Sequence, residues 1–163
     1  MNSKTDVPGY GYQLSKGATS LTESWAALKY VSNNHMMLGH LMEWFFSGVG
    51  GIRQAPGSKA YENILISPDI VGDLTWAETR FNTIHGEIFS AWKIEDNNLI
   101  MRIKIPVNCN AVVAVPQADR TKITMNGNPV TESYDVKVSD EAGVKTMCKI
   151  RSGEYLFKTP YSR

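Results

Sequence analysis

The sequence predicts a mainly β protein, an antiparallel, jelly-roll-like β-sandwich preceded by two helices. Apolar residues alternate with charged ones from Leu99 to Ile105, which is the period-two pattern of a half-buried strand. Turn-forming residues recur at short intervals after residue 57, whereas apolar residues before residue 52 recur at helical spacing. A chain of 163 residues is long enough to bury a core in such a fold.

The helical half runs from Thr19 to about Ile52 and shows two apolar faces. The first face is short and holds Leu21, Trp25 and Leu28. The second is wider and consists of Met37, Leu38, Leu41, Met42, Phe45 and Phe46. We expect one helix for each face, with a loop before them at residues 8–12 and a turn between them at residues 32–34. Because the second face covers a wide arc, we expect it to pack against more protein than this chain contains, and to self-associate when exposed.

The β half is expected to hold about eight short strands. These strands are predicted at residues 62–67, 74–81, 87–94, 99–105, 111–115, 123–125, 145–150 and 155–157. Their separators are turn formers such as Asn126-Gly127 and Ser152-Gly153. Frequent turns between short strands favour an antiparallel sandwich over a parallel sheet.

Composition excludes several classes of function. The formal net charge is +1 and no basic stripe is present, so nucleic acid is not an expected partner. The longest apolar runs are strand-sized and the N-terminus has no apolar core of a signal peptide, so we expect no membrane partner. Cys109 and Cys148 are too few for a disulfide framework or a metal site, and we expect them to be unpaired strand residues. No phosphate-binding loop or other cofactor motif occurs, so no cofactor and no metal are predicted.

Glu23 is the first candidate site residue. It follows an opening rich in glycine and tyrosine that includes Tyr10 and Tyr12. Aromatic rings beside a carboxylate are typical of sugar sites, where rings cover the apolar face of a pyranose and the carboxylate activates water. Spacing alone favours a structural role, in which Glu23 is the first-turn acid of a helix capped by Ser20.

His35 and the strand aromatics leave alternatives open. His35 lies at the start of the second expected helix, where it either binds a ligand or serves as a capping or core histidine. Trp76 and Trp92 lie in predicted strands, where such rings line a carbohydrate groove or, more commonly, the core.

Several phrases of the sequence, taken in order, resemble a known family. These phrases are Pro8-Gly9-Tyr10-Gly11-Tyr12, the segment from Gly17-Ala18-Thr19 to Glu23-Ser24-Trp25, Asn34-His35-Met36-Met37-Leu38-Gly39, and Glu43-Trp44-Phe45-Phe46. They are similar to the closing stretch of family 78 glycoside hydrolases, the bacterial α-L-rhamnosidases. The similarity continues through Gly50-Gly51-Ile52 and Ile105-Pro106-Val107-Asn108, and it covers essentially the whole chain.

The resemblance implies a fold and a role for this chain. Residues 1–56 would be the last part of an (α/α)6 catalytic barrel, and residues 57–163 a C-terminal antiparallel β-sandwich. Glu23 would be the general base of an inverting hydrolase of terminal α-L-rhamnosyl residues. His35, Tyr10, Tyr12 and Trp25 would contact the rhamnose-containing glycan or glycoside.

The resemblance also implies what this chain lacks. Its partners would include the rest of the barrel, whose upstream Asp-x-Pro-x-Arg-x-Glu phrase carries the family's general acid and has no match here. The chain alone is therefore expected to be inactive, and its parent to be periplasmic or secreted. The family often has tryptophan before the base, where this sequence has Thr22. The alternatives are a self-standing carbohydrate-binding module and a purely structural β-sandwich.

Overall fold

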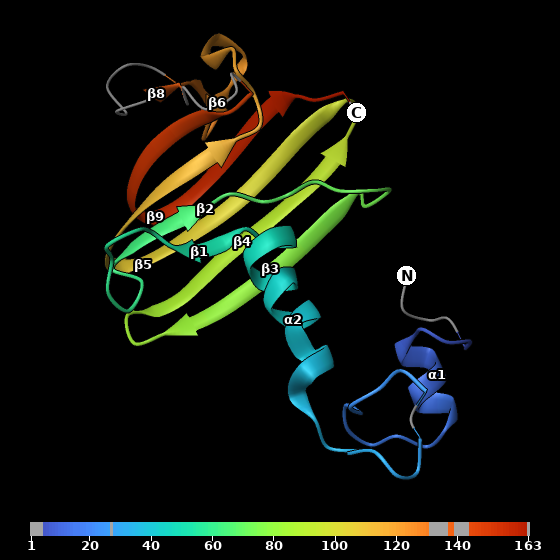
Figure 1. The fold of residues 1–163 in the computed structure, drawn as a ribbon. Coiled ribbons are helices and arrows are strands. Elements are labelled where there is room, and N and C mark those ends of the chain that lie inside the picture. The colour runs from blue at the N-terminus through green and yellow to red at the C-terminus, as the bar shows by residue number, and fades with distance from the viewer. Residues whose placement is uncertain (1–4, 27, 131–136, 139–143, 163) are drawn as a thin grey trace. The chain divides into compact units, whose positions relative to one another are not determined.

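The structure, a computed structural model, describes residues 5–26, 28–130, 137–138 and 144–162 (Figure 1). The chain divides into two compact units, Met1–Trp44 and Phe45–Arg163. Strands dominate the second unit, and helices and turns form the first. The expected domain division between residues 56 and 57 stays a prediction.

Two helical segments precede the strands, as the sequence predicts, but the first lies earlier than expected. Helix α1 spans Tyr10–Ser15, where a loop was predicted. The segment between residues 19 and 34, predicted to be helical up to Leu28, instead forms turns and bends. One cause is Thr22, whose Oγ1 donates to the Ser24 carbonyl at 2.6 Å. Local bonds of this kind satisfy backbone groups without a helix, so they compete with helix formation.

The second apolar face is helical, as predicted. It begins with the 3₁₀-helix η1 (Met36–Gly39), continues as α2 (His40–Trp44) and ends as the π-helical η2 (Phe45–Val49). The chain then turns at Gly51, whose φ of 71° is left-handed. An ideal Cβ at Gly51 would lie 2.2 Å from the Pro68 backbone nitrogen. Only glycine fits this turn, because both the φ angle and the space exclude a side chain.

The second unit is a β-sandwich in which two long strands belong to both layers. The strands are β1 (Ile52–Gln54), β2 (Asn63–Ile66), β3 (Trp76–Thr83), β4 (Gly86–Glu95), β5 (Asn98–Val115), β6 (Thr124–Met125), β7 (Asn128–Pro129), β8 (Lys137–Val138) and β9 (Thr146–Pro160). The first part of β5 pairs with β4 and its last part with β2, while β9 pairs with β5 along both parts. The antiparallel sandwich is thus confirmed, and one pairing, β2 with β5, is parallel.

A bulge lets β5 change layers. The β5–β9 register shifts between Ile105 and Asn110, so five residue steps on β5 face only two on β9, from Gly153 to Arg151. Asn108 has a φ of 63° within this bulge. Bulges bend a strand and increase its twist, which is how one strand can continue from one layer into the other. The segments predicted as separate strands at residues 99–105 and 111–115 are therefore one strand, and so are those at 145–150 and 155–157.

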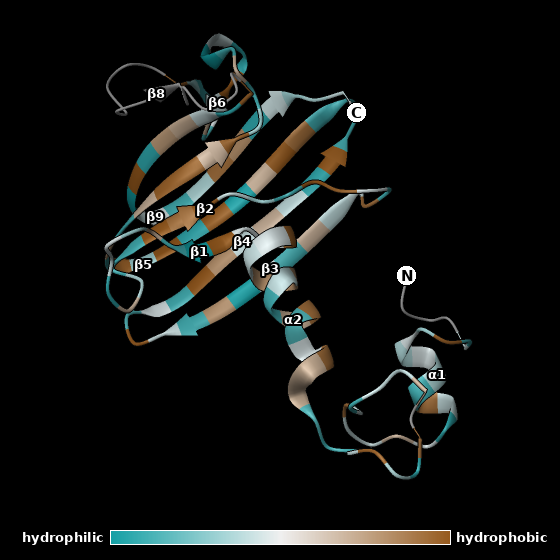
Figure 2. Ribbon diagram, in the orientation of Figure 1, coloured by the Kyte–Doolittle hydropathy of each residue, from teal (hydrophilic) through white to brown (hydrophobic). Residues whose placement is uncertain are grey.

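The core lies between the inward faces of the two layers. Leu99, Met101, Ile103 and Ile105 are each at most 3% exposed, whereas the intervening charged residues are exposed. Figure 2 shows this alternation as bands along β5. Cys109 and Cys148 are also buried, and both are free thiols. Burial raises the pKa of Cys148 to about 11, because an apolar site disfavours the thiolate.

Two buried hydrogen bonds fix β4 to the chain just before β1. The Trp92 indole Nε1 donates to the Val49 carbonyl at 2.8 Å, and the Ser90 hydroxyl donates to the Gly50 carbonyl at 2.7 Å. Trp92 is only 2% exposed. Both bonds satisfy carbonyls that the end of η2 leaves without helical partners.

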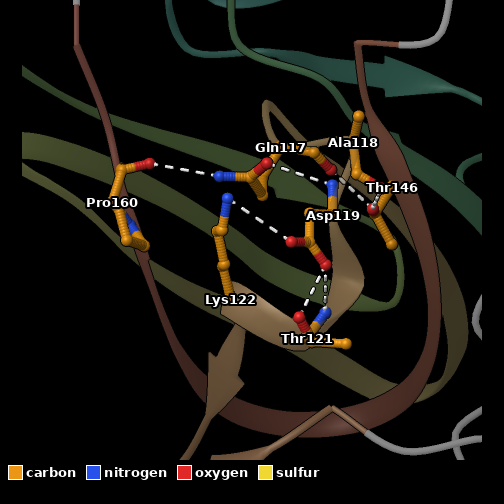
Figure 3. A network of polar contacts seen from close by, with 7 residues as sticks. All are labelled: Gln117, Ala118, Asp119, Thr121, Lys122, Thr146 and Pro160. Atoms are coloured by element: carbon orange, nitrogen blue, oxygen red, sulfur yellow. Dashed lines mark hydrogen bonds and ion pairs between the residues drawn. The ribbon is translucent and has the colours of Figure 1, made fainter.

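A polar network closes the end of the sandwich near η3 (Arg120–Lys122) (Figure 3). Asp119 Oδ1 accepts from the Thr121 hydroxyl at 2.6 Å and the Thr121 amide at 3.1 Å, and Oδ2 lies 3.4 Å from the Lys122 ammonium. The Thr121 hydroxyl bond is the main reason that the pKa of Asp119 is lowered. These contacts are those of a helix cap, so we assign the network a structural role.

Candidate functional site

Two neighbouring segments carry the candidate residues of the first unit. The Glu23 amide donates to the Ser32 carbonyl at 2.8 Å, and the His35 amide donates to the Leu21 carbonyl at 2.8 Å. Segment 20–23 therefore runs beside segment 32–35, in opposite directions. The pairing places Glu23 and His35 on adjacent stretches of chain, although eleven residues separate them in sequence.

The Glu23 carboxylate is half-buried and only partly engaged. Its Oε2 accepts the Ser32 amide at 3.0 Å, and no other hydrogen bond of this carboxylate occurs among the described residues. The capping box with Ser20 is not formed because no helix begins there, and the Ser20 hydroxyl donates to the Asn33 carbonyl instead. One carboxylate oxygen is thus held in place while the other can accept a proton from water or from a sugar hydroxyl.

Two of the three candidate aromatic residues lie together. The Tyr10 and Trp25 rings meet edge to face, with centroids 5.0 Å apart and planes at 72°. The Tyr10 hydroxyl donates to the Leu38 carbonyl, which holds this ring in place. Tyr12 lies in a different contact, with the Lys16 ammonium 5.2 Å from its ring centroid. Tyr10 and Trp25 therefore form an aromatic pair, and one member of it, Trp25, lies two positions after Glu23 in sequence.

His35 matches neither structural alternative. It occupies the position before η1, but its side chain makes no capping hydrogen bond and is exposed. An exposed imidazole without a protein partner among the described residues is free to contact a ligand.

The first unit also has an open apolar hollow of about 540 Å³. Its lining consists of Leu21, Met36, Met37, Gly39, His40 and Met42. Met36 is 86% exposed and Met42 58% exposed. Sequence reasoning did not name this hollow as a site, although the wide apolar arc of the second helix is the signal that could have found it.

Other carboxylates of the first unit are few. Asp6 and Glu43 are both exposed, and Glu43 lies on α2. Among the residues with described positions, no group of three or more His, Cys, Asp or Glu side chains could hold a metal ion. Within that same part of the chain, no helix is long and apolar enough to cross a membrane.

The two strand tryptophans differ sharply. Trp92 is a core residue, whereas Trp76 is 67% exposed on β3. A carbohydrate groove at Trp92 is therefore ruled out by burial, and Trp76 alone keeps that alternative open.

Two family profiles match consecutive parts of the chain. One, described as the bacterial α-L-rhamnosidase six-hairpin glycosidase domain, matches residues 1–49. The other, described as the bacterial α-L-rhamnosidase C-terminal domain, matches residues 51–129. Each matched region coincides closely with one kind of secondary structure, helical before residue 50 and β after it.

Curated proteins and solved structures are similar over nearly the whole chain. An α-L-rhamnosidase of Formosa agariphila is 27% identical over 164 residues, which covers 95% of this chain and 18% of that protein. The structure of an α-L-rhamnosidase from Dictyoglumus thermophilum is 29% identical with a TM-score of 0.77, and it covers 98% of this chain and 18% of that one. The structure of the Streptomyces avermitilis α-L-rhamnosidase complexed with L-rhamnose shows the same fold, with 24% identity and a TM-score of 0.76. The match covers 97% of this chain and 15% of that one. This chain spans less than a fifth of the length of each of these proteins.

Proposed function

Since the chain belongs to the bacterial α-L-rhamnosidase family, as a C-terminal portion of it, we propose that it completes the active site of an inverting α-L-rhamnosidase by supplying Glu23 as the general base. The substrate is a glycan or glycoside with a terminal α-L-rhamnosyl residue. Residues 1–56 belong to the catalytic barrel in this proposal, and residues 57–163 form a structural β-sandwich.

The chemistry requires two carboxyl groups on opposite sides of the anomeric carbon. One takes a proton from the attacking water while the other protonates the leaving oxygen, and in inverting enzymes they stand roughly 6.5–9.5 Å apart to leave room for that water. Glu23 fits the base because one of its oxygens is fixed by the Ser32 amide while the other makes no hydrogen bond among the described residues. This half-engaged carboxylate is the observation that carries the proposal.

The neighbouring residues support a sugar site. The Tyr10–Trp25 pair offers an aromatic surface, and its Trp25 lies two positions from Glu23 in sequence. His35 lies on the adjacent segment, and its exposed ring has no hydrogen-bond partner among the described residues. Aromatic faces bind the apolar side of a pyranose, and an imidazole can bind its hydroxyls. We assign these three residues, and Tyr12 at the rim, to substrate binding.

The general acid must come from the rest of the barrel. Asp6 and Glu43 are the other two carboxylates in the first 44 residues, and both are solvent-exposed. Neither carboxylate lies in an apolar pocket of the kind that suits a carboxyl group to general-acid catalysis at neutral pH. The 163-residue chain by itself is therefore expected to release no nitrophenol from p-nitrophenyl α-L-rhamnopyranoside.

The decisive test compares two matched variants of the full-length enzyme. Glu23→Gln should lower kcat by about a hundredfold to ten-thousandfold, the usual contribution of a general base, while Glu43→Gln should stay near the wild type. Proton NMR of the first-formed rhamnose gives the stereochemistry, and inversion predicts the β-anomer. Near-normal turnover of Glu23→Gln would refute the base assignment, and an α-anomer would refute inversion.

A further inference from the structure

The outer face of the layer formed by β3, β4, β5 and β9 carries an exposed tryptophan beside a groove. Trp76 is 67% exposed on β3, which lies at an edge of the described sheet and pairs there with β4. The groove beside it measures about 330 Å³, and Ala91 and Ile100 form part of its lining. An indole ring next to a small apolar floor presents the flat surface on which a sugar ring stacks.

Charges on this face are mostly paired. The Arg80 guanidinium lies 3.0 Å from Glu78 and 3.4 Å from Glu87. The Lys93 and Lys104 ammonium groups lie 2.7 Å from Glu95 and 4.0 Å from Glu154 respectively. Every carboxylate of this face in the described structure thus has a cation partner.

Two cationic side chains of this face form no ion pair among the described residues. Arg102 and Lys158 point outward, and neither has a carboxylate within 4.0 Å among the described residues. Trp76 on β3 pairs with Lys93 on β4, and Lys93 pairs with Ile100 on β5. Ile100 in turn pairs with Lys158 on β9, so Trp76 and Lys158 lie in one row across the four strands. The surplus charge of the face is therefore positive, and Arg102 lines the groove beside the exposed ring.

Arg102 is held between two grooves. Its guanidinium carbon lies 5.8 Å from the Phe89 ring centroid, a contact that orients the group. Arg102 lines the groove beside Trp76 and also a second groove of about 330 Å³ that contains Asn126 and Tyr155. A planar guanidinium at this position can bind a carboxylate or sulfate through two parallel hydrogen bonds.

We propose that this face binds an anionic saccharide, whose pyranose ring stacks on Trp76 and whose carboxylate or sulfate group binds Arg102. Lys158 adds a second positive charge within the same row of strands. The site lies wholly in the β unit and is independent of hydrolysis at Glu23. Its role would be to hold an acidic, rhamnose-bearing polymer rather than to cleave it.

The test is a binding assay on the 163-residue chain. Oligosaccharides that are neutral, uronate-containing or sulfated are presented on one array, and the strongest ligand is then titrated by calorimetry at low and high salt. We expect retention of uronate-containing or sulfated sugars over neutral ones, and the two acidic classes tell which anion is bound. Affinity should fall at high salt, because a charge pair is screened.

Matched variants locate the site. Trp76→Ala and Arg102→Gln should each weaken binding about tenfold or more, the loss expected for one stacking or charge-assisted contact. Ile84→Ala removes another exposed apolar side chain, and Lys149→Gln removes one positive charge that lies outside both grooves. Both controls should bind within about twofold of the wild type. Circular dichroism checks that each variant is folded.

Three outcomes would overturn the proposal. The first is an array that retains no acidic sugar, and the second is equal binding of neutral and acidic sugars. The third is unchanged affinity in folded Trp76→Ala and Arg102→Gln.

Discussion

The hydrogen bond from Trp92 to the Val49 carbonyl should contribute measurably to the stability of the β unit. Trp92→Phe keeps an aromatic ring but removes the indole N–H, so the buried Val49 carbonyl loses its 2.8 Å partner. An unsatisfied buried polar group costs about 1–3 kcal/mol. The smaller ring also leaves a void of roughly 40 Å³, which adds about 1 kcal/mol at ~24 cal/mol per Å³. We therefore expect a total loss of about 2–4 kcal/mol in the free energy of unfolding.

Urea unfolding of the 163-residue chain, followed by far-UV circular dichroism, measures this loss. The matched control is Trp76→Phe, which makes the same substitution at a side chain that is 67% exposed. That variant should stay within about 0.5 kcal/mol of the wild type. Equal stability of the two variants would refute the assignment of a structural role to the Trp92–Val49 bond.

Three further predictions address the turn, a buried thiol and the exposed apolar face. Gly51→Ala should destabilise the folded chain by about 2 kcal/mol or more, because the new Cβ would lie 2.2 Å from the Pro68 backbone and the φ angle of residue 51 is positive. A melting temperature like that of the wild type would count against this. The Cys148 thiol has a pKa of about 11 in the folded chain against an ordinary 9.0, so it ionises first in the unfolded chain. The free energy of unfolding should therefore fall as pH rises from about 9 to 11. At pH 8, iodoacetamide should label this thiol in the folded chain at least about a hundredfold more slowly than in the urea-unfolded chain. The 163-residue chain should self-associate through its exposed methionines. The double variant Met36→Lys with Met37→Lys should shift it toward the monomer in sedimentation velocity. A wild-type chain that is monomeric at micromolar concentration would contradict this prediction.

The β half of the fold was predictable because strand patterning is local. Alternation at Leu99, Met101 and Ile103 identifies both a strand and its buried face, and the structure confirms both. What the pattern does not contain is the continuity of β5 through its bulge, or the parallel pairing of β2. Both depend on contacts between residues far apart in sequence, which periodicity does not encode.

The helical half was predictable only in part. Leu21, Trp25 and Leu28 have helical spacing, but the side chains of Ser20, Thr22 and Glu23 bond to nearby backbone, so the segment folds as turns. Apolar spacing indicates only which side chains favour burial, not the backbone conformation that buries them. In the proposed barrel, the surface that buries them lies on other helices.

The candidate site followed mainly from the family resemblance. Spacing alone favours a capping role for Glu23 over a catalytic one, but no helix begins at this position, so the cap is not formed. The contact of Tyr10 with Trp25 joins residues on either side of a turn, so no local pattern predicts it. The exposure of Trp76 was not predicted, although Trp76 shares one face of β3 with the charged Glu78 and Arg80.

Because β5 is continuous through both layers of the sandwich, it should make unfolding of the β unit cooperative. Neither layer can lose its central strand without taking that strand from the other, so local opening should spread through the whole β unit. Backbone amides on both halves of β5 and β9 should therefore exchange hydrogen with a single protection free energy, equal to that of global unfolding. A protease that requires an extended, detached strand would find its substrate only in the fully unfolded molecules.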